Sequence, residues 1–253
     1  MRRIDLNADL GESYGRWRLG HDSDLLALVS SASIACGFHA GDPLGLRDTL
    51  ALALTHGVTV GAHPGYPDLL GFGRRDLEAT TAEVENWVIY QIGALTALAR
   101  ATGTNVRYVK PHGALYNKAA RHAPTADAIA RATAAVDSGL VLLGLPGSEI
   151  LAAAERAGLR GAREAFPDRN YEPDGSLTPR SRPDALVSDP ARCADRAARM
   201  ALDGVVEARD GTIVELEPDS LCVHGDGPGA VAVLRAIRAR LELSGVTIAP
   251  FAS

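Results

Sequence analysis

Cysteine and long apolar runs are scarce in this sequence, and their scarcity excludes several classes of protein. The three cysteines lie far apart, at Cys36, Cys193 and Cys222, and none belongs to a Cys-x-x-Cys pair. Such a set argues against both a disulfide framework and a zinc cluster. No uncharged apolar run reaches about 18 residues, and no apolar leader follows the N-terminal arginines, so we expect a cytoplasmic protein without a membrane span.

Basic clusters and a phosphate-binding loop are lacking as well. Lysine and arginine number 26 against 31 acidic residues, for a formal net charge of -5, and no basic stripe carries interleaved aromatic residues. This composition argues against nucleic acid as the main ligand. No Gly-x-x-x-x-Gly-Lys-Ser/Thr run occurs, which excludes a P-loop. The expected ligand is a small molecule.

What the sequence does contain is a regular alternation of short apolar runs with helical patterns. With 253 residues, 46% of them hydrophobic, the chain can bury a full core. The expected strands lie at 4–10, 32–36, 58–62, 105–110, 140–143, 159–163, 212–216, 220–223 and 246–249. The expected helices lie at 25–29, 43–57, 81–103, 124–136, 146–157, 190–204 and 229–244.

Strands that alternate with helices imply a parallel sheet. Seven or eight such units in about 250 residues fit a closed or nearly closed β/α barrel, and a doubly wound open sheet is the alternative. No break in composition marks a linker, so we expect a single domain over residues 1–253. The stretch 164–183, rich in proline and turn residues, is expected to be irregular, and loops of that length are usually lids or binding loops.

Several helix starts carry specific signals. Asp42 before Pro43 has the pattern of an N-cap followed by a first-turn proline. Thr80 and Glu83 have the spacing of a capping box. Asp22, or Asp24 after it, is expected to cap the short helix at 25–29.

The interiors of the expected strands hold some polar and sulfur-containing residues. Asp5, Asn7 and Asp9 alternate with apolar residues along the first strand. Either an edge strand with one wet face or a polar row inside a barrel explains this alternation. We interpret Cys36 and Cys222 as buried packing residues.

Ionisable side chains gather where the expected strands end. In either architecture the carboxyl ends of the strands collect at one edge, where ligands bind. A single histidine or aspartate there is usually a satisfied structural group, but a dense polar cluster usually has a use. Five strand ends carry such pairs: Asp9 with Glu12, His39 with Asp42, His63 with Asp68, Lys110 with His112, and His224 with Asp226.

Two kinds of chemistry fit this cluster. Carboxylates and neutral imidazoles bind divalent metals, so Asp9, His39 and His63 could form a metal-dependent hydrolase site. Alternatively, cationic side chains suit a carboxylate or a phosphate, and the glycine-rich loop at 225–229 could present amide donors to a phosphate. The candidate cations are Lys110, Arg74, Arg75 and Arg169.

Five long ungapped motifs make the chain resemble the family of 5-oxoprolinase A subunits, also called the LamB/YcsF or lactam-utilisation family. They are DLNADLGE at 5–12, SIACGFHAGDP at 33–43, GAHPGYPD at 61–68, GFGRR at 71–75 and VKPHGALYN at 109–117. Two positions depart from the family's expected pattern: Gly227, where Asn or Thr is expected, and Pro167, where Ala is usual.

The resemblance implies a distorted seven-stranded β/α barrel, similar to the glycoside hydrolase and polysaccharide deacetylase barrel. It implies ATP-dependent cleavage of 5-oxo-L-proline to L-glutamate, together with partner subunits B and C. The expected cofactor is ATP with magnesium, and no redox cofactor is expected. Two rivals remain: a metal-dependent amide or carbohydrate deacetylase on the same barrel, and a non-catalytic binding subunit.

The resemblance implies hypothetical roles for the polar residues at the strand ends. Lys110 and Arg169 would neutralise anionic groups, the histidines would orient substrate or relay protons, and an acidic residue would act as a base or magnesium ligand. The expected catalytic residues are Asp9, Glu12, His39, His63, Lys110 and His112. The expected substrate- or phosphate-binding residues are Asn7, Arg74, Arg75, Asp168, Arg169, His224 and Asp226.

Overall fold

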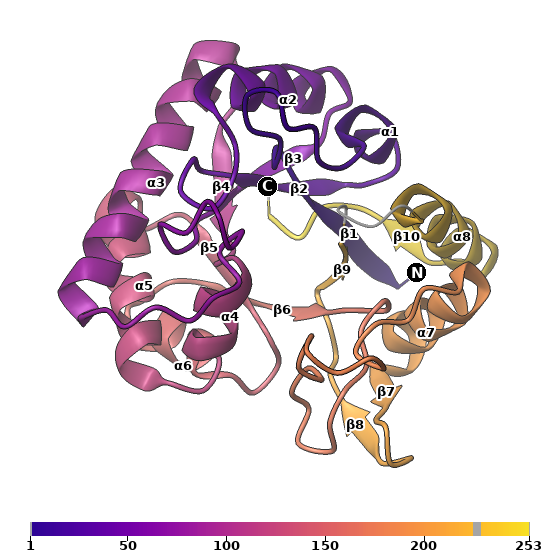
Figure 1. Ribbon diagram of the computed structural model, residues 1–253. Helices are drawn as coiled ribbons and strands as arrows, with labels where there is room; N and C mark the ends of the chain where they lie inside the picture. Colours follow the sequence, from indigo (N-terminus) through magenta and orange to yellow (C-terminus); the bar gives the residue numbers. More distant parts are fainter. Residues whose placement is uncertain (1, 225–228, 253) are drawn as a thin grey trace.

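Seven parallel strands close into a barrel in the structure, a computed structural model that describes residues 2–224 and 229–252 (Figure 1). Each strand pairs with the next, and the last pairs back onto the first with Leu6 opposite Leu221. The expected closed barrel is therefore confirmed, and the doubly wound open sheet is wrong. The barrel strands are β1 (Arg3–Leu10), β2 (Ser31–Ala35), β3 (Thr59–His63), β4 (Val106–Val109), β5 (Val141–Gly144), β6 (Gly161–Ala165) and β9 (Ser220–Val223).

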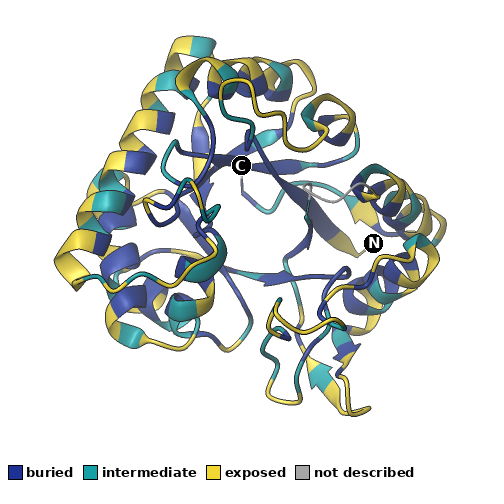
Figure 2. Ribbon diagram, viewed as in Figure 1, coloured by how far each residue is buried: buried dark blue, intermediate teal, exposed yellow. Residues whose placement is uncertain are grey.

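Helices surround this barrel and turn their exposed faces outward (Figure 2). None of the helices in the described ranges is long and apolar enough to cross a membrane. The helices are α1 (Asp22–Leu26), α2 (Pro43–Thr55), α3 (Thr81–Thr102), α4 (Gly113–Ala119), α5 (Ala123–Val136), α6 (Glu149–Arg156), α7 (Pro190–Asp203) and α8 (Ala230–Leu243).

Three short strands lie outside the closed ring. The strand β10 (Thr247–Ile248) pairs in parallel with the start of β1. The strand β8 (Ile213–Glu215) pairs antiparallel with β7 (Val205–Glu207), a strand that the sequence pattern does not predict. The expected strand at 212–216 therefore exists, in a small hairpin beside the barrel.

Two of the three predicted helix caps are confirmed. The Asp42 side chain accepts hydrogen bonds from backbone N–H groups in the first turn of α2, and Thr80 with Glu83 forms a complete capping box on α3. Neither Asp22 nor Asp24 is a cap, because His21 holds that position, both aspartates lie in the first turn of α1, and α1 has no side-chain cap. The Asp22 carboxylate instead accepts from Gly11 N and Thr49 Oγ1, each at 2.9 Å, and so ties the end of β1 to α2.

Two further helix boundaries differ from the sequence pattern. The helix α6 begins at Glu149 rather than at Pro146. Gly147 has a φ of +69°, a left-handed conformation that cannot belong to a right-handed helix. The separate short helix α4 begins directly after His112, because the chain turns there and Ala114 N donates to Gly73 O at 2.9 Å.

The first strand carries a buried polar row on the inside of the barrel. Seven of its eight residues are buried, so the edge-strand explanation is wrong. Asp5 accepts hydrogen bonds from the hydroxyls of Ser30, Ser31 and Ser220, and Asn7 Nδ2 donates to Ser220 Oγ at 2.7 Å. Burial raises the pKa of Asp5 from 3.8 to about 6.

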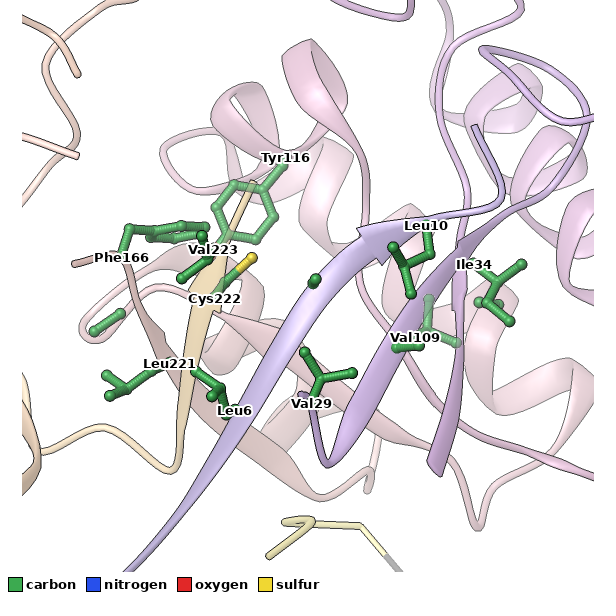
Figure 3. Close-up of a cluster of buried hydrophobic side chains, with 14 of the residues drawn as sticks. Leu6, Leu10, Val29, Ile34, Val109, Tyr116, Phe166, Leu221, Cys222 and Val223 are labelled. Carbon is green, nitrogen blue, oxygen red and sulfur yellow. The ribbon is translucent and has the colours of Figure 1, made fainter. Parts of the chain in front are cut away.

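The intervening apolar residues of β1 belong to the hydrophobic core. Leu6 and Leu10 pack in one cluster with Ile34, Val109 and Leu221 of other barrel strands (Figure 3). Burial of this apolar surface is the main stabilising contribution to the fold. The strand β1 thus places its apolar side chains in the core and its polar side chains in the barrel interior. Asp9, near the carboxyl end of β1, is the last of these polar side chains.

Candidate active site at the carboxyl end of the barrel

A cavity of about 580 Å³ lies at the carboxyl end of the barrel strands. Asp9, His63 and Lys110 line it at or just beyond the ends of β1, β3 and β4. Residues 174–181 of the expected irregular loop and the turn at 145–148 form another part of its wall. A cavity of this size suits a small molecule.

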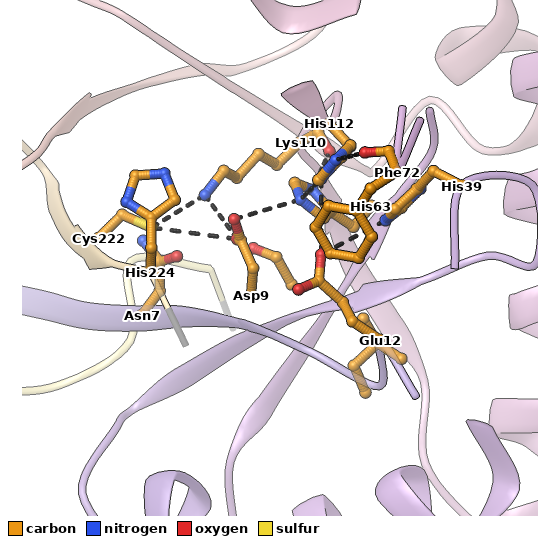
Figure 4. A network of polar contacts seen from close by, with 12 residues as sticks. Asn7, Asp9, Glu12, His39, His63, Phe72, Lys110, His112, Cys222 and His224 are labelled. Carbon is orange, nitrogen blue, oxygen red and sulfur yellow. Dashed lines mark hydrogen bonds and ion pairs between the residues drawn. The ribbon is translucent and has the colours of Figure 1, made fainter. Parts of the chain in front are cut away.

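The Lys110 ammonium lies at the centre of the polar network beside this cavity (Figure 4). Its Nζ donates to Asp9 Oδ1 at 2.8 Å, and it lies 3.0 Å from both Glu164 Oε1 and Cys222 Sγ. Burial opposes the charge, but the attraction of Asp9 and its anionic neighbours raises the pKa of Lys110 well above its usual range. Likewise burial opposes ionisation of Asp9, yet His63 and Lys110 hold its pKa well below the usual range. The pair is therefore an ammonium and a carboxylate.

Three histidine rings pack next to this ion pair. The rings of His39 and His112 are stacked, with centroids 3.7 Å apart and planes within 5°, while His63 is nearly perpendicular to both. Burial, followed by the nearby histidine charges, holds the pKa values of His39 and His112 well below the usual range. Both rings are therefore neutral at pH 7. Glu12 Oε1 lies 3.5 Å from His39 Nε2 and 3.6 Å from His112 Nδ1.

A second polar group approaches the cavity from β9 and the loop after β6. Asp168 Oδ2 accepts from the backbone N–H of His224 at 3.0 Å and lies 2.8 Å from its Nδ1. Arg169 is buried, and its Nη2 donates to Thr178 O at 2.7 Å. Burial lowers the pKa of Arg169 to about 10. The carbonyl of Pro167, one of the two unusual positions, accepts from Arg196 Nε at 3.0 Å, which anchors the loop.

Most of the residues that the sequence predicts for the site come together here. Eight of them line the cavity: Asp9, Glu12, His63, Arg74, Lys110, His112, Arg169 and His224. His39 lies directly behind two of these, against Glu12 and His112. The Arg74 guanidinium lies over the Phe72 ring, 4.9 Å from its centroid. Asp226 lies outside the described residues.

Three other predicted binding residues lie away from the cavity lining. Arg75 points to Asp68, with Arg75 Nε 3.0 Å from Asp68 Oδ1, and its side chain is 63% exposed. Asn7 lies deeper in the barrel, because it precedes Asp9 by one step on the same strand face, and it binds Glu164 and Ser220. Asp168 reaches the cavity only through His224.

Two residues beside Lys110 are missed by the sequence pattern. Glu164 is fully buried in β6, and its carboxylate contacts Lys110 Nζ and Asn7 Nδ2. The sequence pattern ends that strand at residue 163, so Glu164 falls into the expected loop. Had the boundary been placed at Ala165, Glu164 would have been recognised as a sixth polar residue at a strand end. Cys222 is buried as expected, but its Sγ faces Lys110 rather than only apolar neighbours.

The candidate metal ligands also differ from the predicted set. Glu12, His39, His63 and His112 each offer a donor atom, and these atoms lie within 4.8 Å of one another. The sequence pattern proposes Asp9, His39 and His63. The structure thus adds Glu12 and His112, which the sequence places on the rim but assigns to other roles.

Comparisons with known proteins show which family the chain belongs to. The model of the LamB/YcsF family matches residues 4–253. The chain belongs to the LamB/YcsF family. This LamB/YcsF chain is 54% identical to a 5-oxoprolinase A subunit of Agrobacterium fabrum, over 100% of the chain and 99% of that relative. It is 50% identical to the 5-oxoprolinase A subunit of Bacillus subtilis, over 98% of the chain and 96% of that relative.

A solved structure shows the same fold for another lactam-utilisation protein. The crystal structure of the lactam utilization protein from Thermus thermophilus superposes on the LamB/YcsF chain with a TM-score of 0.93. The two sequences are 51% identical, and the match covers 98% of this chain and 99% of that one. The two proteins therefore share the barrel fold.

Proposed function

We propose that this chain is the A subunit of a 5-oxoprolinase, which cleaves 5-oxo-L-proline to L-glutamate while ATP is hydrolysed to ADP and phosphate. Partner subunits B and C would complete the enzyme. The observation that carries the proposal is the Lys110–Asp9 pair beside a small-molecule cavity, in a chain whose full-length relatives are named as 5-oxoprolinase A subunits.

The residues fit the difficulty of the reaction. An unstrained lactam is a poor electrophile, and transfer of a phosphoryl group to its carbonyl oxygen makes the ring carbon easier to attack. Water then adds to that carbon while a base takes its proton, and the ring nitrogen leaves with a proton, which gives an acyl phosphate of glutamate. A second water molecule then releases inorganic phosphate and leaves the carboxylate of L-glutamate. The site must therefore hold anionic oxygens, activate a water molecule and supply a proton.

The first two of these tasks have candidate groups in the cavity. Lys110 and Arg169 supply positive charge for the phosphate or the substrate carboxylate. Asp9, which the neighbouring Lys110 keeps ionised, or Glu12 is the candidate base. His112 lines the same cavity and is suited to orient the substrate or a water molecule. Magnesium would accompany ATP and neutralise its phosphate oxygens.

A reconstitution assay tests this function. The chain alone, the partner subunits alone and the complete complex are each given 5-oxo-L-proline and ATP, and L-glutamate is measured. We expect glutamate only from the complete complex, and only when ATP is present. If the partner subunits alone released glutamate at the rate of the complete complex, the chain would have no part in the reaction.

A second candidate function is a metal-dependent deacetylase. The group Glu12, His39, His63 and His112 favours it, since imidazole and carboxylate ligands can hold a metal that activates water. Such an enzyme would release acetate from N-acetylated substrates without ATP. Acetate release by the chain alone would favour this candidate, whereas glutamate formation that requires ATP would favour the 5-oxoprolinase.

A further inference from the structure

The contacts of two neighbouring histidines fix where their protons lie. His63 Nδ1 lies 2.7 Å from Lys110 O, and His112 Nε2 lies 2.8 Å from Phe72 O. A carbonyl oxygen can only accept, so both of these nitrogens must carry a hydrogen. When each ring carries only that one hydrogen, as metal binding requires, the remaining nitrogens, His63 Nε2 and His112 Nδ1, present lone pairs.

These two lone pairs face each other. The distance between His63 Nε2 and His112 Nδ1 is 2.9 Å. Two lone pairs at that distance repel unless a cation lies between or beside them. The other nitrogen of each ring is held by a backbone carbonyl, which is a usual way in which proteins orient metal-binding histidines.

Two buried carboxylates complete the surroundings of the facing nitrogens. Asp9 Oδ2 lies 3.3 Å from His63 Nε2, and Glu12 Oε1 lies 3.6 Å from His112 Nδ1. Lys110 contacts the other oxygen of Asp9, so Oδ2 faces the histidines. The two facing nitrogens and these two carboxylate oxygens therefore form one group of four potential donor atoms.

We propose that His63 Nε2, His112 Nδ1, Glu12 and Asp9 bind one divalent transition-metal ion. Ligand atoms about 2.1 Å from one ion lie about 3.0 to 3.4 Å from each other, and the observed separations of 2.9, 3.3 and 3.6 Å bracket this range. Small side-chain shifts would complete the geometry. Two imidazoles with two carboxylates suit zinc, iron or manganese better than magnesium or calcium.

His39 is excluded from this ligand set although it lies in the same cluster. Its ring is stacked parallel to that of His112 at 3.7 Å. Ring nitrogens bind metals in the plane of the ring, so two stacked rings cannot both direct lone pairs at one ion. Neither His39 nitrogen makes a hydrogen bond within the described residues. We therefore assign His39 a packing and positioning role against His112 and Glu12.

The proposed ion would face the molecule that the cavity binds. Asp9, Glu12, His63 and His112 all line the cavity. A bound metal there can polarise a carbonyl or lower the pKa of a water molecule. The inference stands on the ligand geometry alone, so it holds whether or not the substrate is 5-oxo-L-proline.

Metal content and metal affinity test the proposal without an activity assay. The untagged full chain is purified, its metals are measured by plasma mass spectrometry, and the chelated chain is titrated with Zn²⁺ and with Co²⁺ as a spectroscopic probe. We expect one ion per chain. We expect His63→Gln and His112→Gln to lose affinity by more than about 100-fold, because losing a ligand exceeds the 10- to 100-fold effect of losing its supporting partner.

Matched variants keep this test decisive. His56→Gln alters an exposed histidine of the α2 C-terminus and should bind as the wild type does. His39→Gln should retain a 1:1 stoichiometry, and Glu12→Gln, which preserves shape, should weaken binding if the other variants prove unstable. The proposal is overturned if the chelated wild-type chain binds neither ion, or if His63→Gln binds as tightly as His56→Gln. It is also overturned if nitrogen NMR shows a proton shared by His63 and His112 in a chain that takes up no metal. Metal binding and ATP-dependent glutamate release are measured in separate assays, so failure of the metal proposal is distinguishable from failure of the proposed function.

Discussion

Lys110 joins three strands of the barrel through one ammonium group. Its Nζ contacts Asp9 at the end of β1, Glu164 in β6 and Cys222 in β9. Its side chain is 3% exposed, so these contacts replace water almost completely. Buried charges of this kind are stable only when paired. The same residue therefore contributes to stability and to the charge of the cavity.

Removal of this ammonium should destabilise the fold. In Lys110→Met, Asp9 and Glu164 lose their buried partner, and we expect the free energy of unfolding to fall by about 3–5 kcal/mol. The double variant Lys110→Met/Glu164→Gln should recover part of this loss, because one unpaired carboxylate is removed. Urea denaturation of the three proteins measures the difference. A loss below about 1 kcal/mol in Lys110→Met would show that Lys110 is not the main partner of these carboxylates.

At the residue scale, most of the site can be predicted from the polar residues that follow each expected strand. This prediction succeeds for Asp9, His63 and Lys110 because parallel strands bring their carboxyl ends to one edge. It fails for Glu164, since a boundary error of two residues moves a side chain from strand to loop. Arg75, which is predicted from its charge, does not line the cavity, because its pairing with Asp68 depends on how a loop folds back on itself, and no local pattern encodes that.

At the element scale, β1 contributes a row of polar side chains to the barrel interior. Its inward side chains are Asp5, Asn7 and Asp9, at three depths of the barrel, and only Asp9 reaches the cavity. Asp5 has serine hydroxyls as partners and lacks a cation among them. That difference explains why burial raises the pKa of Asp5 while the pKa of Asp9 is lowered.

The raised pKa of Asp5 gives stability a measurable dependence on pH. The folded-state pKa of about 6 exceeds the ordinary 3.8, so this group stabilises the fold at low pH and loses that contribution as the pH rises through 6. From pH 5 to pH 8 the loss from this group should be about 1.4 kcal/mol. Asp5→Asn cannot titrate, so its stability relative to the wild type should rise by that amount. Urea denaturation at both pH values measures the change, and a constant difference between the two proteins would contradict it.

Helices with strong end signals are predictable, and short elements are not. Asp42 and Thr80 mark the starts of α2 and α3 through side-chain hydrogen bonds with backbone N–H groups, which are local and therefore visible in the sequence. The helix α4 and the strand β7 are too short to show a periodic pattern. The α6 boundary depends on the left-handed conformation of Gly147, which the three-dimensional turn imposes.

At the scale of the whole molecule, closure of the barrel creates the site. The pairing of β9 with β1 brings Cys222 and His224 to the same end as Asp9, although more than 200 positions separate them in the sequence. Strand-helix alternation is equally compatible with an open sheet, so the choice of a closed ring depends on long-range pairing. The expectation of seven strands comes from the family motifs, which lie between residues 5 and 117.

The cavity with Lys110 and His112 is, in our proposal, the place where the lactam is opened. The most direct measurement is the rate of ATP-dependent glutamate release by the reconstituted complex with Lys110→Ala or His112→Ala in this chain, with His56→Gln as the control. Each variant is first shown by circular dichroism to be folded at the assay temperature. Loss of a general acid, base or charge-stabilising group should lower the rate at least about 100-fold in both variants, while the control keeps the wild-type rate. Rates equal to the wild type in both alanine variants would contradict this assignment.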